Sequence, residues 1–285
     1  MHVFHEIEPL RGFIAAHRQD RRVAFVPTMG ALHHGHGACV RIARAVDRGL
    51  VVCSVFVNPA QFAPGEDFDR YPRTLEADLD RLREWRCDAV FAPALDVIYP
   101  HPQRAWVDVE GLSEPLCGRF RPGHFRGVAT VVSKLIHIVR PDVAVFGQKD
   151  AQQALIVRAL VTELDLGIEL KLAATVREAD GLAVSSRNRY LEPAQRRAAV
   201  ALSEALGAVR RLVEAGERDV AALRRALAER VAAAPGAVVD YAEVVDADTL
   251  QPVDRLTEPV VAVLAVRFGA TRLIDNLPLP VPPAD

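Results

Sequence analysis

The first half of the chain alternates short apolar runs with stretches whose apolar residues recur at helical spacing. The apolar runs have the length and β-branched content of strands buried on both faces, and they are residues 22–27, 50–57, 88–92 and 143–146. The periodic stretches predict amphipathic helices over residues 35–47, 74–86, 128–139 and 150–164. Strands and helices in this alternating order predict an α/β fold with a doubly wound parallel sheet.

The pattern changes after about residue 175. A polar segment, 177–189, precedes two Ala- and Arg-rich stretches that predict helices over 193–215 and 219–234. Strand-like runs follow at 238–245, 260–268 and 271–275. We therefore predict two domains, a doubly wound α/β domain over residues 1–175 and a smaller α+β domain over 176–285, with a frayed proline-rich tail over 278–285.

The composition narrows the class of protein. Half of the 285 residues are hydrophobic and a quarter are charged, which excludes a disordered chain. The formal net charge of −2 gives no general attraction to nucleic acid or membranes. No apolar stretch approaches the roughly 20 residues of a membrane helix. The four cysteines form no CxxC pair, which argues against a zinc knuckle or a disulfide framework. We therefore expect a cytoplasmic protein.

The strongest chemical signal is the segment 27–36, PTMGALHHGH, which lies between the first predicted strand and the first predicted helix. In an open α/β sheet, ligands bind beyond the carboxyl ends of the strands, and a helix N-terminus at that edge suits phosphate. His33 and His36 share a helical face, from which imidazoles can donate hydrogen bonds to phosphate oxygens. The alternatives are a His-rich helix start that binds nothing and a metal site, although no nearby Cys or carboxylate completes a ligand set.

Two further polar clusters suit phosphate. Lys149 follows a predicted strand, and it is one of only three lysines among 35 basic residues. A lysine in such an arginine-rich chain indicates that its compact ammonium is needed at this position. Asp150 beside it can cap the next helix or bind a ribose hydroxyl. The segment 184–188, VSSRN, offers two hydroxyls and a guanidinium to a triphosphate, or else forms an ordinary Ser/Thr turn.

Neutral amides and a basic segment complete the candidate set. Asn58 and Gln61 follow the second predicted strand, and Gln153 lies one turn into a later predicted helix. Amide side chains can hold hydroxyls and a carboxylate without adding charge, although each one alone is more often structural. The basic segment 119–127 is predicted as a loop, either a solvated turn or a mobile wall that closes over an anionic substrate.

Taken in order, these motifs resemble those of the pantothenate synthetase (pantoate–β-alanine ligase) family. The matching stretches are residues 27–36, 56–62, 71–74, 121–128, 146–153 and 180–188, and the likeness extends from about residue 23 to 276. The resemblance implies a Rossmann-like N-terminal domain that binds nucleotide and pantoate, a C-terminal lid domain, and a homodimer. It also implies the reaction, in which ATP, pantoate and β-alanine give pantothenate, AMP and pyrophosphate with Mg²⁺, through a pantoyl-adenylate intermediate.

The resemblance assigns roles to residues at matching positions. The implied catalytic residues are His36, His33 and Lys149. The implied ATP-binding residues are Met29, Gly30, Ala31, Leu32, His33, His34, Gly35, His36, Gly147, Gln148, Lys149, Asp150, Val176, Val184, Ser185, Ser186 and Arg187. The implied pantoate- and β-alanine-binding residues are Gln61, Gln153, Asn58, Arg121 and His124. Asp78 is the implied candidate for the magnesium side.

Three positions depart from the family pattern. Gln148 stands where Glu is usual, Gly37 where an apolar residue is usual, and Ala60 where Met is usual. None of these changes removes an implied catalytic group, so we expect them to affect efficiency more than activity.

Two rivals from other classes share the predicted fold. A nucleotidylyltransferase would call for more cationic partners than the amide set offers. A non-catalytic nucleotide sensor would be expected to lose His36 or Lys149, and this chain keeps both.

Overall fold

The computed structural model describes residues 1–279, which form two compact units. The N-terminal unit comprises residues 1–114, 121–148 and 153–174, and the C-terminal unit comprises 115–120, 149–152 and the residues from 175 onward. Two short segments of the C-terminal unit thus lie, in sequence, inside the range predicted for the first domain. Of the predicted frayed tail, residues 280–285 lie outside the described residues, whereas Pro278 belongs to the last strand.

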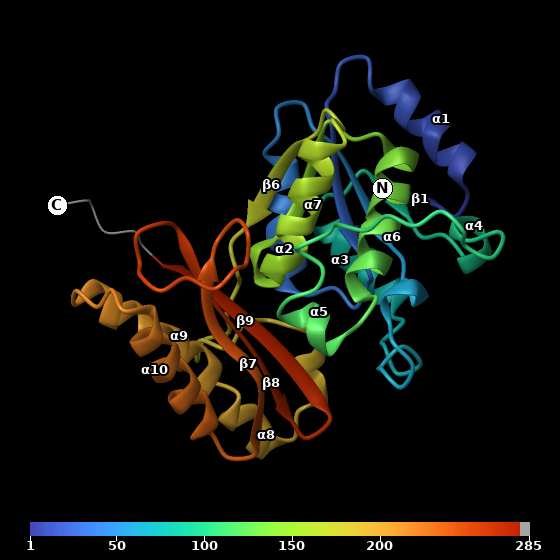
Figure 1. Cartoon of the computed structure of the whole chain (residues 1–285). Helices are drawn as coiled ribbons and strands as arrows, with labels where there is room; N and C mark the ends of the chain where they lie inside the picture. Colours follow the sequence, from blue (N-terminus) through green and yellow to red (C-terminus); the bar gives the residue numbers. More distant parts are fainter. Residues whose placement is uncertain (280–285) are drawn as a thin grey trace. The chain divides into compact units, whose positions relative to one another are not determined.

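Among the described residues, a parallel sheet of six strands forms the centre of the N-terminal unit (Figure 1). Its strands are β1 (His2–Phe4), β2 (Val23–Thr28), β3 (Leu50–Val55), β4 (Ala89–Phe91), β5 (Val143–Gly147) and β6 (Glu169–Ala173). Their order in the sheet is β1-β4-β3-β2-β5-β6, and each neighbouring pair is parallel. The predicted α/β class with a doubly wound sheet is therefore confirmed.

Helices cover both faces of this sheet. Successive residues of a strand point to opposite faces, so in β2 Phe25 packs into one apolar cluster and Val26 into the other. The first cluster is covered by α1 (Ile7–His17), α4 (Leu95–Ile98), α6 (His124–Val139) and α7 (Ala151–Glu163). The second is covered by α2 (His34–Arg44) and α3 (Leu75–Glu84). Burial on both faces explains why these strands read as continuous apolar runs in the sequence.

The chain reverses its direction of winding beside β2. From β2 it proceeds through β3 to β4 on one side, whereas β5 pairs with β2 on the other side. Doubly wound sheets bind ligands at such a reversal, beyond the carboxyl ends of the strands. The connections that leave β2 and β5 at this edge begin at Met29 and Gln148.

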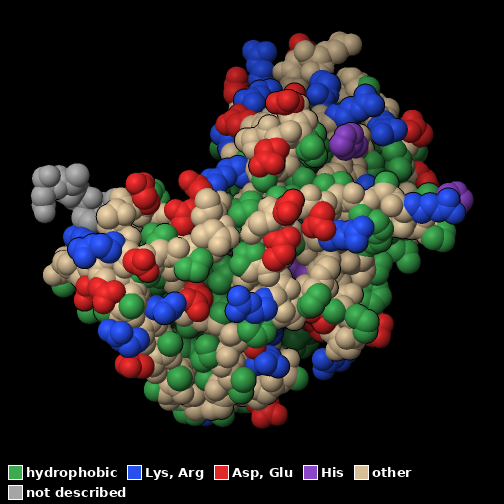
Figure 2. Space-filling model, viewed as in Figure 1, with side chains coloured by type: hydrophobic (Ala, Val, Ile, Leu, Met, Phe, Trp, Pro, Cys, Tyr) green, Lys and Arg blue, Asp and Glu red, His purple; other side chains and the backbone are tan. Residues whose placement is uncertain are grey.

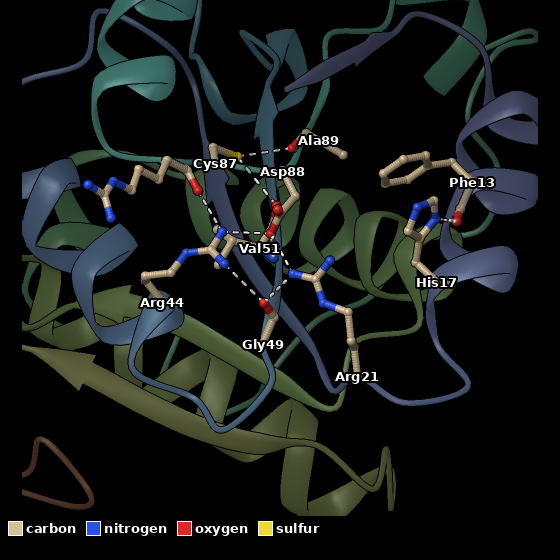
Figure 3. A network of polar contacts seen from close by, with 10 residues as sticks. Phe13, His17, Arg21, Arg44, Gly49, Val51, Cys87, Asp88 and Ala89 are labelled. Carbon is tan, nitrogen blue, oxygen red and sulfur yellow. Dashed lines mark hydrogen bonds and ion pairs between the residues drawn. The ribbon is translucent and has the colours of Figure 1, made fainter.

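At the amino ends of the strands, a hydrogen-bond network surrounds Asp88, the residue that precedes β4 (Figure 3). Asp88 Oδ2 accepts hydrogen bonds from Arg44 Nη2 at 2.6 Å and Arg21 Nη2 at 3.1 Å. It also accepts from the N–H of Val51 at 2.8 Å. Both guanidinium groups donate in addition to the carbonyl of Gly49, which precedes β3. These contacts fix the amino ends of β3 and β4, opposite the carboxyl ends from which the polar loops leave.

The C-terminal unit is built on an antiparallel sheet in the order β7-β8-β9. Its strands are β7 (Ala237–Asp246), β8 (Val260–Phe268) and β9 (Thr271–Leu279). Helices α9 (Ala201–Glu214) and α10 (Val220–Ala232) pack on the sheet, as Figure 1 shows, and bury Leu206, Leu223 and Leu264 in one core. The shorter segments are α5 (Cys117–Phe120), α8 (Pro193–Ala198) and the 3₁₀ turn η3 (Ser186–Tyr190).

Two element predictions are wrong. The helix predicted over 193–215 is two helices, because the backbone turns at Ala199 and Val200 between α8 and α9. The basic segment 119–127 is a loop only over residues 121–123, since α5 ends at Phe120 and α6 already begins at His124.

Both edge strands of the parallel sheet and the first helix were missed. β1 is only three residues long, which is too short for a periodic pattern. β6 is an edge strand in which Glu169 and Lys171 alternate with Leu170 and Leu172, so it lacks the continuous apolar run of its neighbours. Helix α1 buries only Leu10 and Ile14, one turn apart, and this pair alone gives a weak signal.

The surface shows no segregation of charge on the face in Figure 2, where Lys and Arg side chains are interspersed with Asp and Glu. This distribution agrees with the formal net charge of −2. Across residues 1–279, none of the helices combines the length and the apolar character that crossing a bilayer requires.

The unusual Gly37 is explained by its neighbour Trp85. Gly37 lies in the first half of α2, and Trp85 follows the last residue of α3. A Cβ atom at position 37 would lie 3.0 Å from Cε2 and Cζ2 of the Trp85 ring. The indole therefore occupies the space that an apolar side chain at position 37 would need.

We predict that Gly37→Leu lowers the free energy of unfolding by about 1–3 kcal/mol, because the new side chain overpacks against Trp85. Trp85→Leu in the same chain should restore most of the loss. Gly12→Leu is the matched control, since Gly12 is also helical but a Cβ there meets nothing within 4 Å. Denaturant unfolding of the single and double variants measures both effects. Equal costs at positions 12 and 37 would contradict the explanation.

Candidate active site

The loop that leaves β2 forms a start of α2 that is capped by histidines. Gly30 and Ala31 have positive φ values of 82° and 50°, and such a conformation is unfavourable for alanine. His33 is the N-cap, and its Nδ1 accepts from the N–H of Gly35 at 3.2 Å. His36 Nδ1 accepts in turn from the N–H of His33 at 3.2 Å. Two imidazoles thus make the reciprocal hydrogen bonds that a Ser and a Glu make in an ordinary capping box.

This capping geometry also determines the tautomers of the two histidines. A neutral imidazole whose Nδ1 accepts a hydrogen bond carries its proton on Nε2. The rings of His33 and His36 lie together, with centroids 4.1 Å apart. Each Nε2–H is therefore a donor near the N-terminus of α2, where the backbone N–H groups and the helix dipole favour an anion.

Helix α3 holds the same loop through two charged residues. The Asp78 carboxylate is 2% exposed and accepts from the N–H groups of Ala31 at 2.9 Å and Leu32 at 2.7 Å. It also accepts from the Thr74 hydroxyl at 3.3 Å. One turn further along α3, Arg81 Nη1 donates to the carbonyl of Leu32 at 2.7 Å. These bonds stabilise the unfavourable backbone of Ala31 and fix where His33 begins the helix.

The assignment of Asp78 to the magnesium side stays a prediction. Its carboxylate already accepts three hydrogen bonds, and no three His, Cys, Asp or Glu side chains gather as a metal site within residues 1–279. The residues present therefore do not fit a magnesium ion held by the protein alone. Magnesium commonly binds to nucleotide phosphates and retains water, with few protein ligands.

A buried amide cluster lies beside the histidine loop. Asn58 precedes the 3₁₀ turn η1 (Pro59–Gln61) and Gln61 ends it, and the two are 1% and 7% exposed. They are joined by a hydrogen bond of 3.0 Å from Asn58 Nδ2 to Gln61 Oε1. Gln61 Nε2 donates to the sulfur of Met29 at 3.1 Å. The structure thus brings Gln61 against the loop that carries the two histidines, although Met29 and Gln61 are 32 positions apart in sequence.

Two residues that the sequence analysis did not single out fix this cluster. The Tyr99 hydroxyl donates to Asn58 Oδ1 at 2.8 Å, and burial raises the pKa of Tyr99 to about 12, so the phenol keeps its proton. Gly127 of α6 accepts from Asn58 Nδ2 at 3.2 Å, and a Cβ there would collide with the carbonyl of Ala60. No local pattern indicates either contact, because both partners are distant in sequence.

Arg121 and His124 surround the backbone of Gln61. His124 Nδ1 lies 2.8 Å and Arg121 Nη2 lies 3.3 Å from the Gln61 carbonyl oxygen. Arg121 also forms a two-pronged ion pair with Glu66, at 2.7 and 2.6 Å. Burial raises the pKa of Glu66, but the hydrogen bonds and charge of Arg121 outweigh burial and leave that pKa lowered. The predicted role of Arg121 and His124 toward substrate stays a prediction, and their present contacts anchor Gln61.

The C-terminal unit carries a second group of predicted site residues. A small cavity is lined there by Lys149, Ser185, Asn188 and Asp275, together with apolar side chains. Lys149 lies in the 3₁₀ turn η2 (Gln148–Asp150), and its Nζ is 3.9 Å from Asp150 Oδ1. Ser185 forms a Ser/Thr turn, accepting from the N–H of Arg187 at 3.3 Å, and the role of its segment toward a triphosphate stays a prediction. The cavity therefore gathers an ammonium and a hydroxyl from segments that are far apart in the chain.

The roles of Val176, Val184 and Gln153 stay predictions. Val176 accepts from the N–H of Val184 through its carbonyl, at 2.9 Å, so these two predicted residues are paired by their backbones. Gln153 is partly buried in α7.

The N-terminal unit has the features of a phosphate-binding α/β enzyme, with a doubly wound sheet and a histidine-capped helix at its reversal point. The family model described as Pantoate-beta-alanine ligase matches residues 2–278 of the chain. A pantothenate synthetase of Moorella thermoacetica is 51% identical over 282 residues, covering 99% of each chain. One of Salinibacter ruber is 52% identical over 280 residues, covering 95% of this chain and 94% of the relative.

Solved structures agree with these sequence relatives. The crystal structure of pantothenate synthetase from Thermus thermophilus has a TM-score of 0.93 and 44% identity, covering 98% of this chain and 100% of that one. The pantoate-β-alanine ligase of Francisella tularensis, complexed with β-γ ATP and β-alanine, has a TM-score of 0.79 and 28% identity, covering 98% and 97%.

The chain belongs to the pantoate–β-alanine ligase family. It is therefore an amide-forming ligase of pantothenate biosynthesis, and the two rival classes are set aside.

We predict that Asp78→Asn lowers ligase turnover by about 10- to 10²-fold, because an amide nitrogen cannot accept from a loop N–H and the histidines lose their position. The Mg²⁺ concentration that gives half-maximal rate should stay that of the wild type. Asp80→Asn is the matched control, since Asp80 is on the same helix with its side chain 72% exposed. A higher Mg²⁺ midpoint, with rate restored by excess Mg²⁺, would instead support a magnesium role for Asp78.

Proposed function

We propose that this ligase acts in two steps. Pantoate carboxylate attacks the α-phosphorus of ATP to give pantoyl-adenylate and pyrophosphate, and the amine of β-alanine then displaces AMP to form pantothenate. The observation that carries this proposal is the contact between the phosphate-binding loop and the neutral amide cluster, through Met29 and Gln61. This juxtaposition suits a reaction that joins a hydroxylated carboxylate to a nucleotide phosphate.

The chemistry explains why such a site needs position more than a nucleophile. A free carboxylate is a poor acyl donor because its leaving group would be oxide, whereas the adenylate loses AMP. The enzyme therefore has to align pantoate with the α-phosphorus and to stabilise charge as pyrophosphate departs. We assign this stabilisation to the Nε2–H groups of His33 and His36, to the N-terminus of α2 and to the Lys149 ammonium.

The substrate contacts follow the chemistry of the side chains. We assign pantoate to the amides of Gln61, Asn58 and Gln153, which can pair with its hydroxyls and carboxylate. The Francisella tularensis ligase was crystallised with β-γ ATP and β-alanine, and we propose that ATP and β-alanine are substrates here too. We also propose that ATP brings Mg²⁺ on its phosphates, and that the enzyme is a cytoplasmic homodimer like the family it resembles.

We predict that pantoate alone supports exchange of labelled pyrophosphate into ATP. The adenylate-first order requires no β-alanine for this half-reaction. Purified enzyme is assayed with ATP, labelled pyrophosphate and pantoate, and the control without pantoate should show no exchange. Exchange that appears only when β-alanine is also present would contradict the proposed order of steps.

We predict that Lys149→Ala slows adenylate formation by about 10²–10³-fold, roughly 3–4 kcal/mol, by analogy with the loss of an oxyanion donor. The ammonium meets charge that grows in the transition state, so the rate should fall more than the affinity for ATP. Lys149→Arg should restore little, since a planar fork does not replace a compact charge.

Single-turnover measurements separate the two half-reactions of the Lys149 variants. Attack of β-alanine on supplied pantoyl-adenylate should stay near the wild-type rate. A variant slowed equally in both steps would argue against this role of Lys149.

A further inference from the structure

We propose that Asn276 is a positioning residue for Lys149. The inference rests on the role proposed above for the Lys149 ammonium and adds the group that holds it. Asn276 lies in β9 of the C-terminal unit and is 4% exposed. Its Nδ2 donates a hydrogen bond of 2.8 Å to the backbone carbonyl of Lys149, across 127 positions of sequence.

The contact ties a short turn to a strand of a different sheet. Lys149 belongs to η2, which connects β5 to α7. Residues 149–152 belong to the C-terminal unit, as does Asn276. The Asn276 amide is one of the bonds that account for this, and it acts on the backbone of the residue whose side chain carries the charge.

The neighbouring residue Asp275 makes Asn276 a rigid support. Asp275 is 2% exposed and forms a two-pronged ion pair with Arg177, at 2.6 and 3.0 Å. Asp275 Oδ1 also accepts from the N–H of Asn276 at 2.8 Å. The backbone at Asn276 is further paired with Val263 of β8. The donor to Lys149 is thus fixed by strand pairing and by a buried carboxylate.

The ion pair between Asp275 and Arg177 also supports a second segment that lines the cavity. Arg177 Nη1 donates to the carbonyl of Gly181 at 3.0 Å, which holds the turn that leads to Ser185. Lys149, Ser185 and Asp275 line the same cavity. Adjacent positions of β9 therefore hold both Lys149 and the segment that carries the serines.

The physical consequence concerns the placement of the ammonium. Lysine has a flexible side chain of four carbons, so its charge is placed only as well as its backbone is fixed. Catalytic contacts that strengthen in the transition state are sensitive to displacements of about 1 Å, which can cost 10²-fold in rate. Loss of the Asn276 amide should therefore slow adenylate formation while Lys149 is still present.

A double-mutant cycle tests the inference with full-length enzyme. Asn276→Ala should slow pantoate-dependent pyrophosphate exchange by about 10- to 10²-fold, with the KM for pantoate unchanged. In the Lys149→Ala background, the same substitution should cost less than about twofold, because a residue that acts through Lys149 has nothing left to position. Arg267→Ala is the matched control, since Arg267 lies on the neighbouring strand β8 and its loss breaks an ion pair with Asp240.

The outcomes separate the two levels of the proposal. Thermal unfolding and circular dichroism of each variant show that it is folded, and Asn276→Ser replaces Asn276→Ala in the cycle if the alanine variant is not. Equal losses in the wild-type and Lys149→Ala backgrounds, or a similar loss in Arg267→Ala, would overturn the positioning role of Asn276. Normal adenylation in Lys149→Ala would overturn the role of Lys149 itself, and with it this inference.

Discussion

The buried carboxylate of Asp78 is the constraint on which the histidine loop between β2 and α2 depends. A carboxylate removed from water must be fully hydrogen-bonded, because an unpaired buried charge is very unfavourable. Asp78 meets this requirement with the backbone N–H groups of Ala31 and Leu32, and the loop must adopt positive φ values to present them. A Cβ at Gly30 would lie 2.9 Å from Asp78 Oδ2, so glycine is required there. The position of His33 at the helix start follows from these local demands.

Much of the parallel sheet could be predicted because its strands are buried on both faces. Runs such as Leu50–Val55 carry their signal in a few consecutive residues, and the polar residues that follow them mark the carboxyl edge. The pairing of His33 with His36 was equally local, since the two are three residues apart. The edge strand β6 lacked such a signal because polar and apolar residues alternate along it and only its last residue is buried.

The residues that support the site could not be predicted in the same way. Tyr99, Gly127 and Asn276 act through contacts with partners that lie 41, 69 and 127 positions away. A single sequence gives the chemistry of a side chain but not the distant group that it meets. Asp78 shows the same limit, since the sequence gives no sign that its carboxylate accepts from backbone N–H groups 46 and 47 positions away.

Departures from the family pattern have different physical meanings. Gly37 belongs to a packing pair with Trp85, so the two positions are understood only together. At position 60 the backbone carbonyl lies where a side chain on Gly127 would be, so position 127 requires glycine.

The hydrogen bond from Asn276 to Lys149 has a consequence for the order in which the enzyme matures during synthesis. The histidine loop and its partner Asp78 are complete within the first 78 residues, so the ribosome delivers them together. Lys149 receives its amide support only when a residue 127 positions later has emerged and β9 has paired with β8. The histidine loop and its Asp78 support are therefore synthesised well before the backbone of Lys149 can receive its amide hydrogen bond.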